Sequence, residues 1–85
     1  MEGIMEGKYN ELQKIQIEAG KEMGLSEEQL ELYADPDFTW DQMEQILLGF
    51  CNGLSVEEIK TYAKKKYGRH KMAELRMELL HKKSN

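Results

Sequence analysis

Cysteine, proline and long apolar runs are all scarce in this 85-residue sequence, which has one cysteine, Cys51, and one proline, Pro36. A single cysteine excludes a disulfide within the chain, and we expect a reducing, cytoplasmic setting. A membrane-spanning helix needs about 20 consecutive apolar residues, and neither such a run nor a signal peptide is evident, so we expect a soluble protein with no membrane partner. Strand-like alternation is also missing, which predicts an all-α fold.

Basic residues are scarce over the first 59 positions. Residues 1–59 carry three lysines and fourteen acidic residues, whereas residues 60–85 carry nine lysines or arginines and only Glu74 and Glu78. Such an asymmetry indicates either a charged partner for the basic end or attraction between the two halves of the chain.

A self-match at a spacing of 29 residues organises the chain around the stretch from Tyr33 to Gly53. A fixed period of this length is typical of a repeated supersecondary unit. We therefore predict a single helical-repeat domain over residues 1–85, with a partial first repeat at 1–23 and fuller repeats at 24–52 and 53–81. The matched pairs include Gln13 with Gln42, Ile17 with Ile46, Gly20 with Gly49, Gly24 with Gly53, Leu25 with Leu54, Ser26 with Ser55, Tyr33 with Tyr62 and Met43 with Met72.

Helix starts are marked by three capping boxes, in which a Ser or Thr and a Gln or Glu three residues later satisfy the unpaired amides of a helix N-terminus. The boxes are Ser26 with Gln29, Thr39 with Gln42, and Ser55 with Glu58. Together with glycines that end helices, they predict a small bundle of about five alternating long and short helices, near residues 10–23, 26–34, 39–52, 56–66 and 69–82.

Apolar residues spaced three and four apart predict the inward face of each long helix. In the first helix this face is Leu12, Ile15, Ala19 and Met23. In the central helix it is Trp40, Met43, Ile46, Leu47, Phe50 and Cys51, and in the last helix Met72, Leu75, Leu79 and Leu80. We expect Trp40 to be largely buried, and Cys51 to be a small buried hydrophobe whose thiol reacts slowly.

The central repeat follows the pattern Tyr-Ala-x-Pro-x-Phe-x-x-x-Gln-Met-x-x-Ile-x-x-Gly, carried by Tyr33, Ala34, Pro36, Phe38, Gln42, Met43, Ile46 and Gly49. This pattern resembles a short tandem motif of uncharacterised small proteins from Firmicute phages, plasmids and integrative elements. The resemblance covers residues 24–53 well and 54–81 loosely, since Lys65, Lys71 and Glu78 replace the proline, glutamine and glycine. It implies a helical module from a bacterial mobile element and supplies no functional residues.

Side chains that could bear chemistry do not form a recognisable site. Four of them alternate as calcium ligands do: Asp35, Asp37, Thr39 and Asp41. The calcium loop needs glycine where this chain has Trp40 and a bidentate glutamate where it has Ile46. Cys51, His70 and His81 lack the spacings of metal ligands. We therefore predict no catalytic residue, no metal and no cofactor, in a protein that is not an enzyme.

Two functions fit these observations. The first is a non-catalytic protein–protein interaction module of a phage or mobile-element accessory protein that acts on a host or defence factor. The alternative is a nucleic-acid-binding protein that resembles a helix-turn-helix and binds weakly through its basic C-terminal helices. The candidate partner-binding residues are Lys64, Lys65, Lys66, Arg69, Lys71, Arg76 and Met77.

Overall fold

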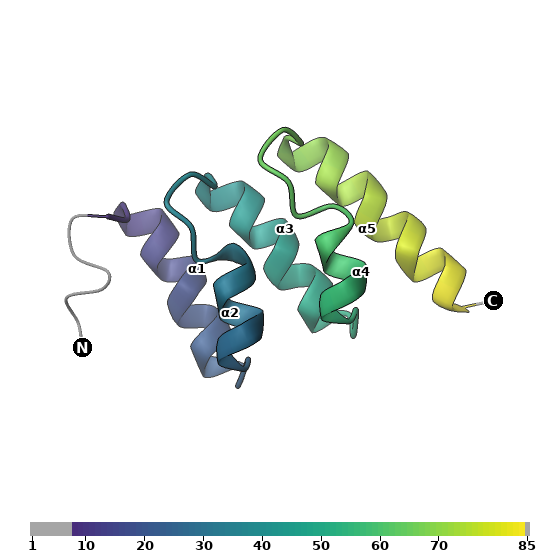
Figure 1. Cartoon of the computed structure of the whole chain (residues 1–85), viewed down its shortest axis with the longest axis horizontal. Helices are drawn as coiled ribbons and strands as arrows, with labels where there is room; N and C mark the ends of the chain where they lie inside the picture. The colour runs from purple at the N-terminus through teal and green to yellow at the C-terminus, as the bar shows by residue number, and fades with distance from the viewer. Residues whose placement is uncertain (1–7, 85) are drawn as a thin grey trace.

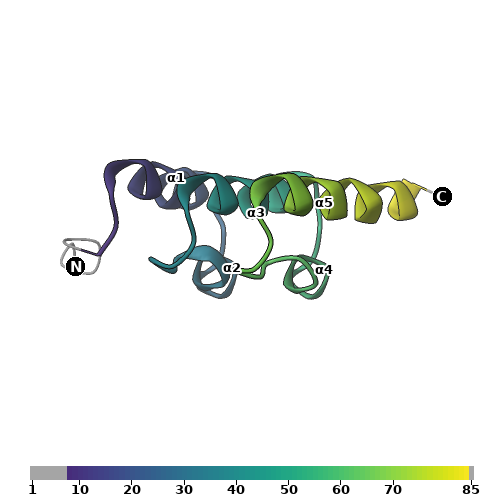
Figure 2. The ribbon, with the colours of Figure 1, turned by 90° about the horizontal axis from the view of Figure 1, so that it is seen from above.

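The computed structural model describes residues 8–84 of the chain, and the regular secondary structure of these residues is entirely helical. Helices α1 (Glu11–Glu22), α3 (Trp40–Cys51) and α5 (Arg69–Ser84) are long, whereas α2 (Glu27–Tyr33) and α4 (Val56–Lys60) are short. The long helices lie side by side in one layer, and the short helices form a second layer (Figures 1 and 2). The predicted all-α fold of alternating long and short helices is confirmed.

Local sequence accounts for most of the helix ends. The three predicted capping boxes are formed, and Asn10 with Gln13 forms a fourth at the start of α1. In each box, the side chain of the cap residue accepts a hydrogen bond from the backbone N–H of the residue three positions later. The side chain of that later residue accepts a hydrogen bond from the backbone N–H of the cap residue. Gly24 and Gly53 follow α1 and α3 with φ of 85° and 87°, a left-handed conformation that glycine adopts without steric cost.

Two glutamines hold each repeat to the next. The side-chain amide of Gln13 donates to the carbonyl oxygen of Phe38 at 2.6 Å and to that of Pro36 at 3.2 Å. One 29-residue period later in the sequence, Gln42 donates to the carbonyl of Tyr67 at 2.7 Å and to that of Lys65 at 3.2 Å. Each glutamine therefore caps its own long helix and fixes the loop that leads into the next one.

Two tyrosines attach the short helices to the long ones. The hydroxyl of Tyr33 on α2 donates to the backbone carbonyl of Gln16 at 2.9 Å, and the hydroxyl of Tyr62 donates to that of Gln45 at 2.7 Å. Both tyrosine side chains are fully buried. Each hydroxyl lies against a glycine, because a Cβ added to Gly20 or Gly49 would lie 2.0 or 2.2 Å from it.

The core lies between the two layers and continues along the array of helices. Its buried apolar residues are Ile17, Tyr33, Phe38, Met43, Ile46, Leu47, Phe50, Leu54, Ile59, Tyr62 and Met72. Phe38 with Met43 and Leu54 with Ile59 are both buried pairs, as expected for hydrophobic staples at the starts of α3 and α4. The inward residues predicted for α3 are therefore confirmed at Met43, Ile46, Leu47 and Phe50.

The predicted inward stripe of α1 is confirmed only at Ala19, which packs against the core, and is wrong at its other three positions. Leu12, Ile15 and Met23 are 47%, 57% and 43% exposed. The buried residues of α1 are instead Gln13, Ile17 and Gly20. These are the residues that the 29-residue match pairs with the buried Gln42, Ile46 and Gly49 of α3. The repeat register, rather than the apolar spacing within α1, determines which face is buried.

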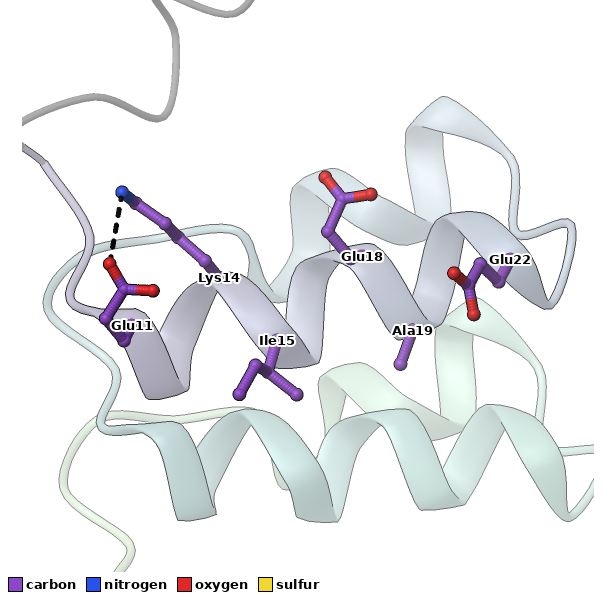
Figure 3. Close-up of a pocket in the computed structure, with 6 residues that line it drawn as sticks. All are labelled: Glu11, Lys14, Ile15, Glu18, Ala19 and Glu22. Atoms are coloured by element: carbon purple, nitrogen blue, oxygen red, sulfur yellow. Dashed lines mark ion pairs between the residues drawn. The ribbon is translucent and has the colours of Figure 1, made fainter.

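The side of α1 that faces away from α3 is polar. Lys14 and Glu18 point to this side (Figure 3), and Glu18 pairs with Lys21 at 3.6 Å. A helix at the end of an array has no neighbour on one side, so a polar outer face keeps that end solvated. The repeat shows this change from apolar to polar residues directly. The α3 counterparts of Lys14, Glu18 and Lys21 are Met43, Leu47 and Phe50, and all three of these are buried.

Trp40 is mostly covered, as expected, although it does not belong to the buried core. It is the first residue of α3, and its counterparts in the other repeats, Glu11 and Arg69, are both exposed. This position therefore lies towards solvent on each long helix, which leaves part of the indole ring of Trp40 exposed.

Helix α4 ends at Lys60, earlier than the predicted end near Lys66. The N–H groups of Thr61 and Tyr62 bond to carbonyls three residues back, which tightens the chain into a turn. The chain must leave the helix here, because Gln42 binds the carbonyls of Lys65 and Tyr67 in the loop that follows.

Replacement of Gly49 by alanine should destabilise the fold strongly. The added Cβ would lie 2.2 Å from the Tyr62 hydroxyl and 2.4 Å from Cδ1 of Ile59, and such overpacking costs about 1–3 kcal/mol of unfolding free energy. Gly68→Ala is the matched control, because its Cβ would meet nothing within 4 Å. Urea unfolding followed by circular dichroism measures both, and equal losses would contradict the tyrosine–glycine contact.

Stability should fall at alkaline pH. Burial, and secondarily the charge of Cys51, raises the pKa of Tyr33 from 10.0 to about 12 despite an opposing backbone hydrogen bond, and burial also raises the pKa of Tyr62. In the folded chain the two hydroxyls therefore stay protonated at pH values where the unfolded chain, with tyrosine pKa values near 10, loses these protons. Their contribution to the free energy of unfolding is complete below pH 10 and is lost as pH rises towards 12. Urea midpoints between pH 9 and 12 should drop less steeply for Tyr33→Phe than for the wild-type chain; an identical slope would refute the assignment.

Candidate functional site

The predicted basic surface is partly neutralised within the chain. Lys65 Nζ lies 2.7 Å from Oδ2 of Asp35 and 4.0 Å from that of Asp37, and it also lies 5.6 Å from the centre of the Phe38 ring. The hydrogen bond from Lys65, with a second from the backbone of Asp37, lowers the pKa of Asp35. Attraction between the acidic and basic halves therefore operates where the α2–α3 and α4–α5 loops meet.

Arg76 also has its hydrogen bonds inside the molecule. Its Nε donates to Oε1 of Gln45 at 3.3 Å, and its Nη1 donates to Oδ1 of Asn52 at 2.8 Å. The guanidinium thus ties α5 to α3. This side chain contributes to the packing between the last two long helices.

The other basic candidates remain on the surface around the start of α5. Lys64, Lys66, Arg69 and Lys71 are all exposed. Lys71 pairs with Glu74 at 3.8 Å, with both side chains at least half exposed, and Lys66 lies 5.4 Å from the centre of the Tyr67 ring. Exposed ion pairs of this kind hold a side chain only weakly. We call these four residues the basic corner.

Met77 lies apart from the basic corner, further along α5. It is 56% exposed and lines a shallow surface hollow together with Glu74, Glu78, His81 and Lys82. The structure therefore divides the seven candidate residues into two cations with partners in other parts of the chain, of which Lys65 is still exposed, four further exposed cations and one exposed apolar side chain.

A different exposed surface was missed by the sequence reasoning. Leu12, Ile15 and Met23 are exposed along one side of α1 and its C-terminal cap, with the partly buried Ala19 between them, and we call these four residues the α1 stripe. The signal was present in the repeat, because the α3 counterparts of Leu12, Ile15 and Met23 are the polar residues Asp41, Glu44 and Asn52. Positions that accept polar residues in one repeat are poor candidates for the core of another.

A hollow of about 310 Å³ lies over α1 beside the stripe and is lined by Glu11, Lys14, Ile15, Glu18, Ala19 and Glu22. Figure 3 shows Ile15 and Ala19 pointing towards α3, whereas Lys14 and Glu18 point away from it. Lys14 pairs with Glu11 at 3.9 Å. The hollow is therefore apolar along the α3 side and charged along the outer side.

Cys51 is exposed, and its predicted burial is wrong. It is the last residue of α3, and its Sγ lies 3.5 Å from Sδ of Met23 at the end of the α1 stripe. Its counterpart in the first repeat, Glu22, is also exposed. This register position therefore lies outside the core, although the residue itself is apolar.

Among residues 8–84, no three His, Cys, Asp or Glu side chains are grouped as metal ligands would be. None of the helices that the structure describes combines the length and the apolar character needed to cross a bilayer. His70 and His81 are both exposed on α5.

Comparisons with known proteins found no match to a protein-family model, to a curated protein or to a solved structure.

Native Cys51 should react rapidly with a thiol reagent. Its exposure leaves the sulfur open to attack, in contrast to a buried structural thiol, which is inert. Labelling with a chromogenic disulfide in native buffer should approach the rate seen in denaturant. Met23→Ala, which removes the neighbouring thioether, should not slow the reaction; a native rate far below the denatured rate would show that Cys51 is covered.

Proposed function

We propose that this chain is a non-catalytic module that binds another protein, and that the α1 stripe forms part of the binding surface. The observation that carries this proposal is the exposure of Leu12, Ile15 and Met23 on a single helix, at 43% or more each. Single exposed apolar side chains are ordinary on protein surfaces, but contiguous ones mark interaction sites.

The fold itself does not require apolar residues at these positions. In α3, the same register positions hold Asp41, Glu44 and Asn52, and α3 nevertheless packs in the centre of the array. Complete burial of a fully exposed leucine or isoleucine side chain yields about 1.5–3 kcal/mol, and Leu12 and Ile15 are 47% and 57% exposed, so about half of this remains to be gained at each. A partner that covers the stripe would gain this free energy, which the isolated chain leaves unused.

The biological setting of the proposal comes from the sequence. The resemblance of residues 24–53 to mobile-element proteins supports an accessory protein of a phage or integrative element, with a host or defence factor as its target. An unpaired, exposed Cys51 is compatible with action in the reducing cytoplasm.

Weak nucleic-acid binding at the basic corner is the second candidate function. Lys64, Lys66, Arg69 and Lys71 are exposed, which favours contact with phosphates. The pairing of Lys65 with Asp35 counts against it, because it brings carboxylate charge to the same edge of the molecule. This arrangement would weaken the attraction for a polyanion.

Affinity capture from a bacterial lysate, with and without nuclease, tests the proposed function. A protein captured by the wild-type chain should survive nuclease and should be lost with Ile15→Asp, which places a charge on the exposed stripe without disturbing the core. The matched control is Met77→Asp, an equally exposed apolar position on α5, and it should retain the captured protein.

The outcome that favours the second candidate is equally specific. In that outcome, nuclease abolishes the capture. The double variant Lys64→Glu with Lys66→Glu also abolishes it, whereas Ile15→Asp does not. Such a result would show that the chain binds nucleic acid instead of a protein. Circular dichroism of each variant verifies that the helical fold is retained.

A further inference from the structure

We infer that the partner segment that covers the α1 stripe is a basic amphipathic helix. This inference rests on the proposed function and names the chemical class of the partner. Three features of the surface carry it: the spacing of the stripe, the carboxylates beside it on α1, and the lack of a suitable helix on a second copy of the chain.

The spacing of the stripe matches a helical partner. Its residues follow one another at three, four and four positions, from Leu12 to Met23, so they form one line along about three turns of α1. A helix that lies along such a line presents its own apolar residues at the same period. The hollow beside Ile15 and Ala19 gives room for one of these side chains.

Carboxylates lie beside the stripe on α1 itself. Glu11, Glu18 and Glu22 are exposed, and all three line the hollow together with Ile15 and Ala19. Lys14 and Lys21 balance part of this charge through their pairs with Glu11 and Glu18. The surroundings of the stripe remain acidic, which selects lysine and arginine on the partner.

A second copy of this chain is a poor occupant. Its basic helix is α5, but Met72 is buried in the core and Leu75 and Leu79 pack against that core. Met77 is the large apolar side chain that α5 exposes. A single methionine cannot match the three exposed anchors of the α1 stripe, so the basic helix must come from another protein.

Titration with a synthetic peptide tests the partner class. The probe is a fluorescent helical peptide of leucine and lysine, with leucine at helical spacing and long enough to cover three turns, and its twin has glutamate in place of lysine. We expect the lysine peptide to bind the full chain, and both Ile15→Asp and the pair Glu18→Lys with Glu22→Lys to weaken this binding by about tenfold or more. The glutamate peptide should bind worse by at least the same factor.

The matched control separates a local site from general attraction to an acidic chain. Glu28→Lys with Glu57→Lys makes the same change in net charge, on exposed positions of α2 and α4, and should leave the affinity within about threefold of wild type. An equal loss in this control, or equal binding of the glutamate peptide, would overturn the inference.

Two further outcomes distinguish this inference from the function on which it rests. Lysate capture that depends on Ile15, together with no binding of the lysine peptide, would refute the basic helix and leave the proposed function standing. Self-association of the wild-type chain in sedimentation, abolished by Ile15→Asp, would show that a second copy covers the stripe and would also refute the inference.

Discussion

The contact between a tyrosine hydroxyl and a glycine is the constraint on which the two-layered packing depends. Tyr33 and Tyr62 are completely buried, and a buried hydroxyl without a hydrogen-bond acceptor would cost about 1–3 kcal/mol. The acceptors are backbone carbonyls of the preceding long helix, and the hydroxyl reaches them only where no Cβ intervenes. The positions of the tyrosine and the glycine are therefore coupled. This coupling fixes α2, which carries Tyr33, and the turn after α4, which carries Tyr62, to the long helices that carry the glycines.

The same constraint explains why α5 differs from the other long helices. Glu78 stands on α5 at the register position of Gly20 and Gly49. A third tyrosine of the same kind could not lie against α5, because its hydroxyl would meet a carboxylate side chain instead of a gap. Together with the polar outer side of α1, this substitution gives the array two faces that are unsuited to further stacking of the same repeat.

Much of this fold could be predicted from the sequence, because its helix starts depend on local chemistry. The boxes at Ser26, Thr39 and Ser55 form as the sequence indicates, since a cap involves residues only three positions apart. The inward face of α1 could not be read from apolar spacing, because its buried residues include a glutamine that binds two distant carbonyls and a glycine that receives a tyrosine. Both lie opposite the exposed Ile15, so the apolar stripe indicated the wrong face.

The candidate surface was harder to predict than the fold, for a related reason. Lys65 and Arg76 resemble unpaired cations in the sequence, but each meets partners 24 to 31 residues away that only the folded chain brings near. Ile15 resembles a core residue, and only its α3 counterpart, Glu44, shows that the position is open to solvent. The sequence thus indicated the wrong surroundings for these residues, because contacts between distant parts of the chain determine them.

The acidic and basic halves of the chain pair locally but lie mostly at opposite ends of the array. The ion pairs between its halves join neighbouring repeats or neighbouring helices, as with Lys65 and Asp35 at 2.7 Å and Lys83 and Glu58 at 3.2 Å. Helices α1 and α5 lie at opposite sides of an array that extends 43 Å along its longest axis, whereas exposed charges are screened beyond about 8 Å at physiological salt. The acidic surroundings of the α1 stripe are therefore not neutralised by the basic end of the same molecule, and both surfaces keep their charge for separate contacts.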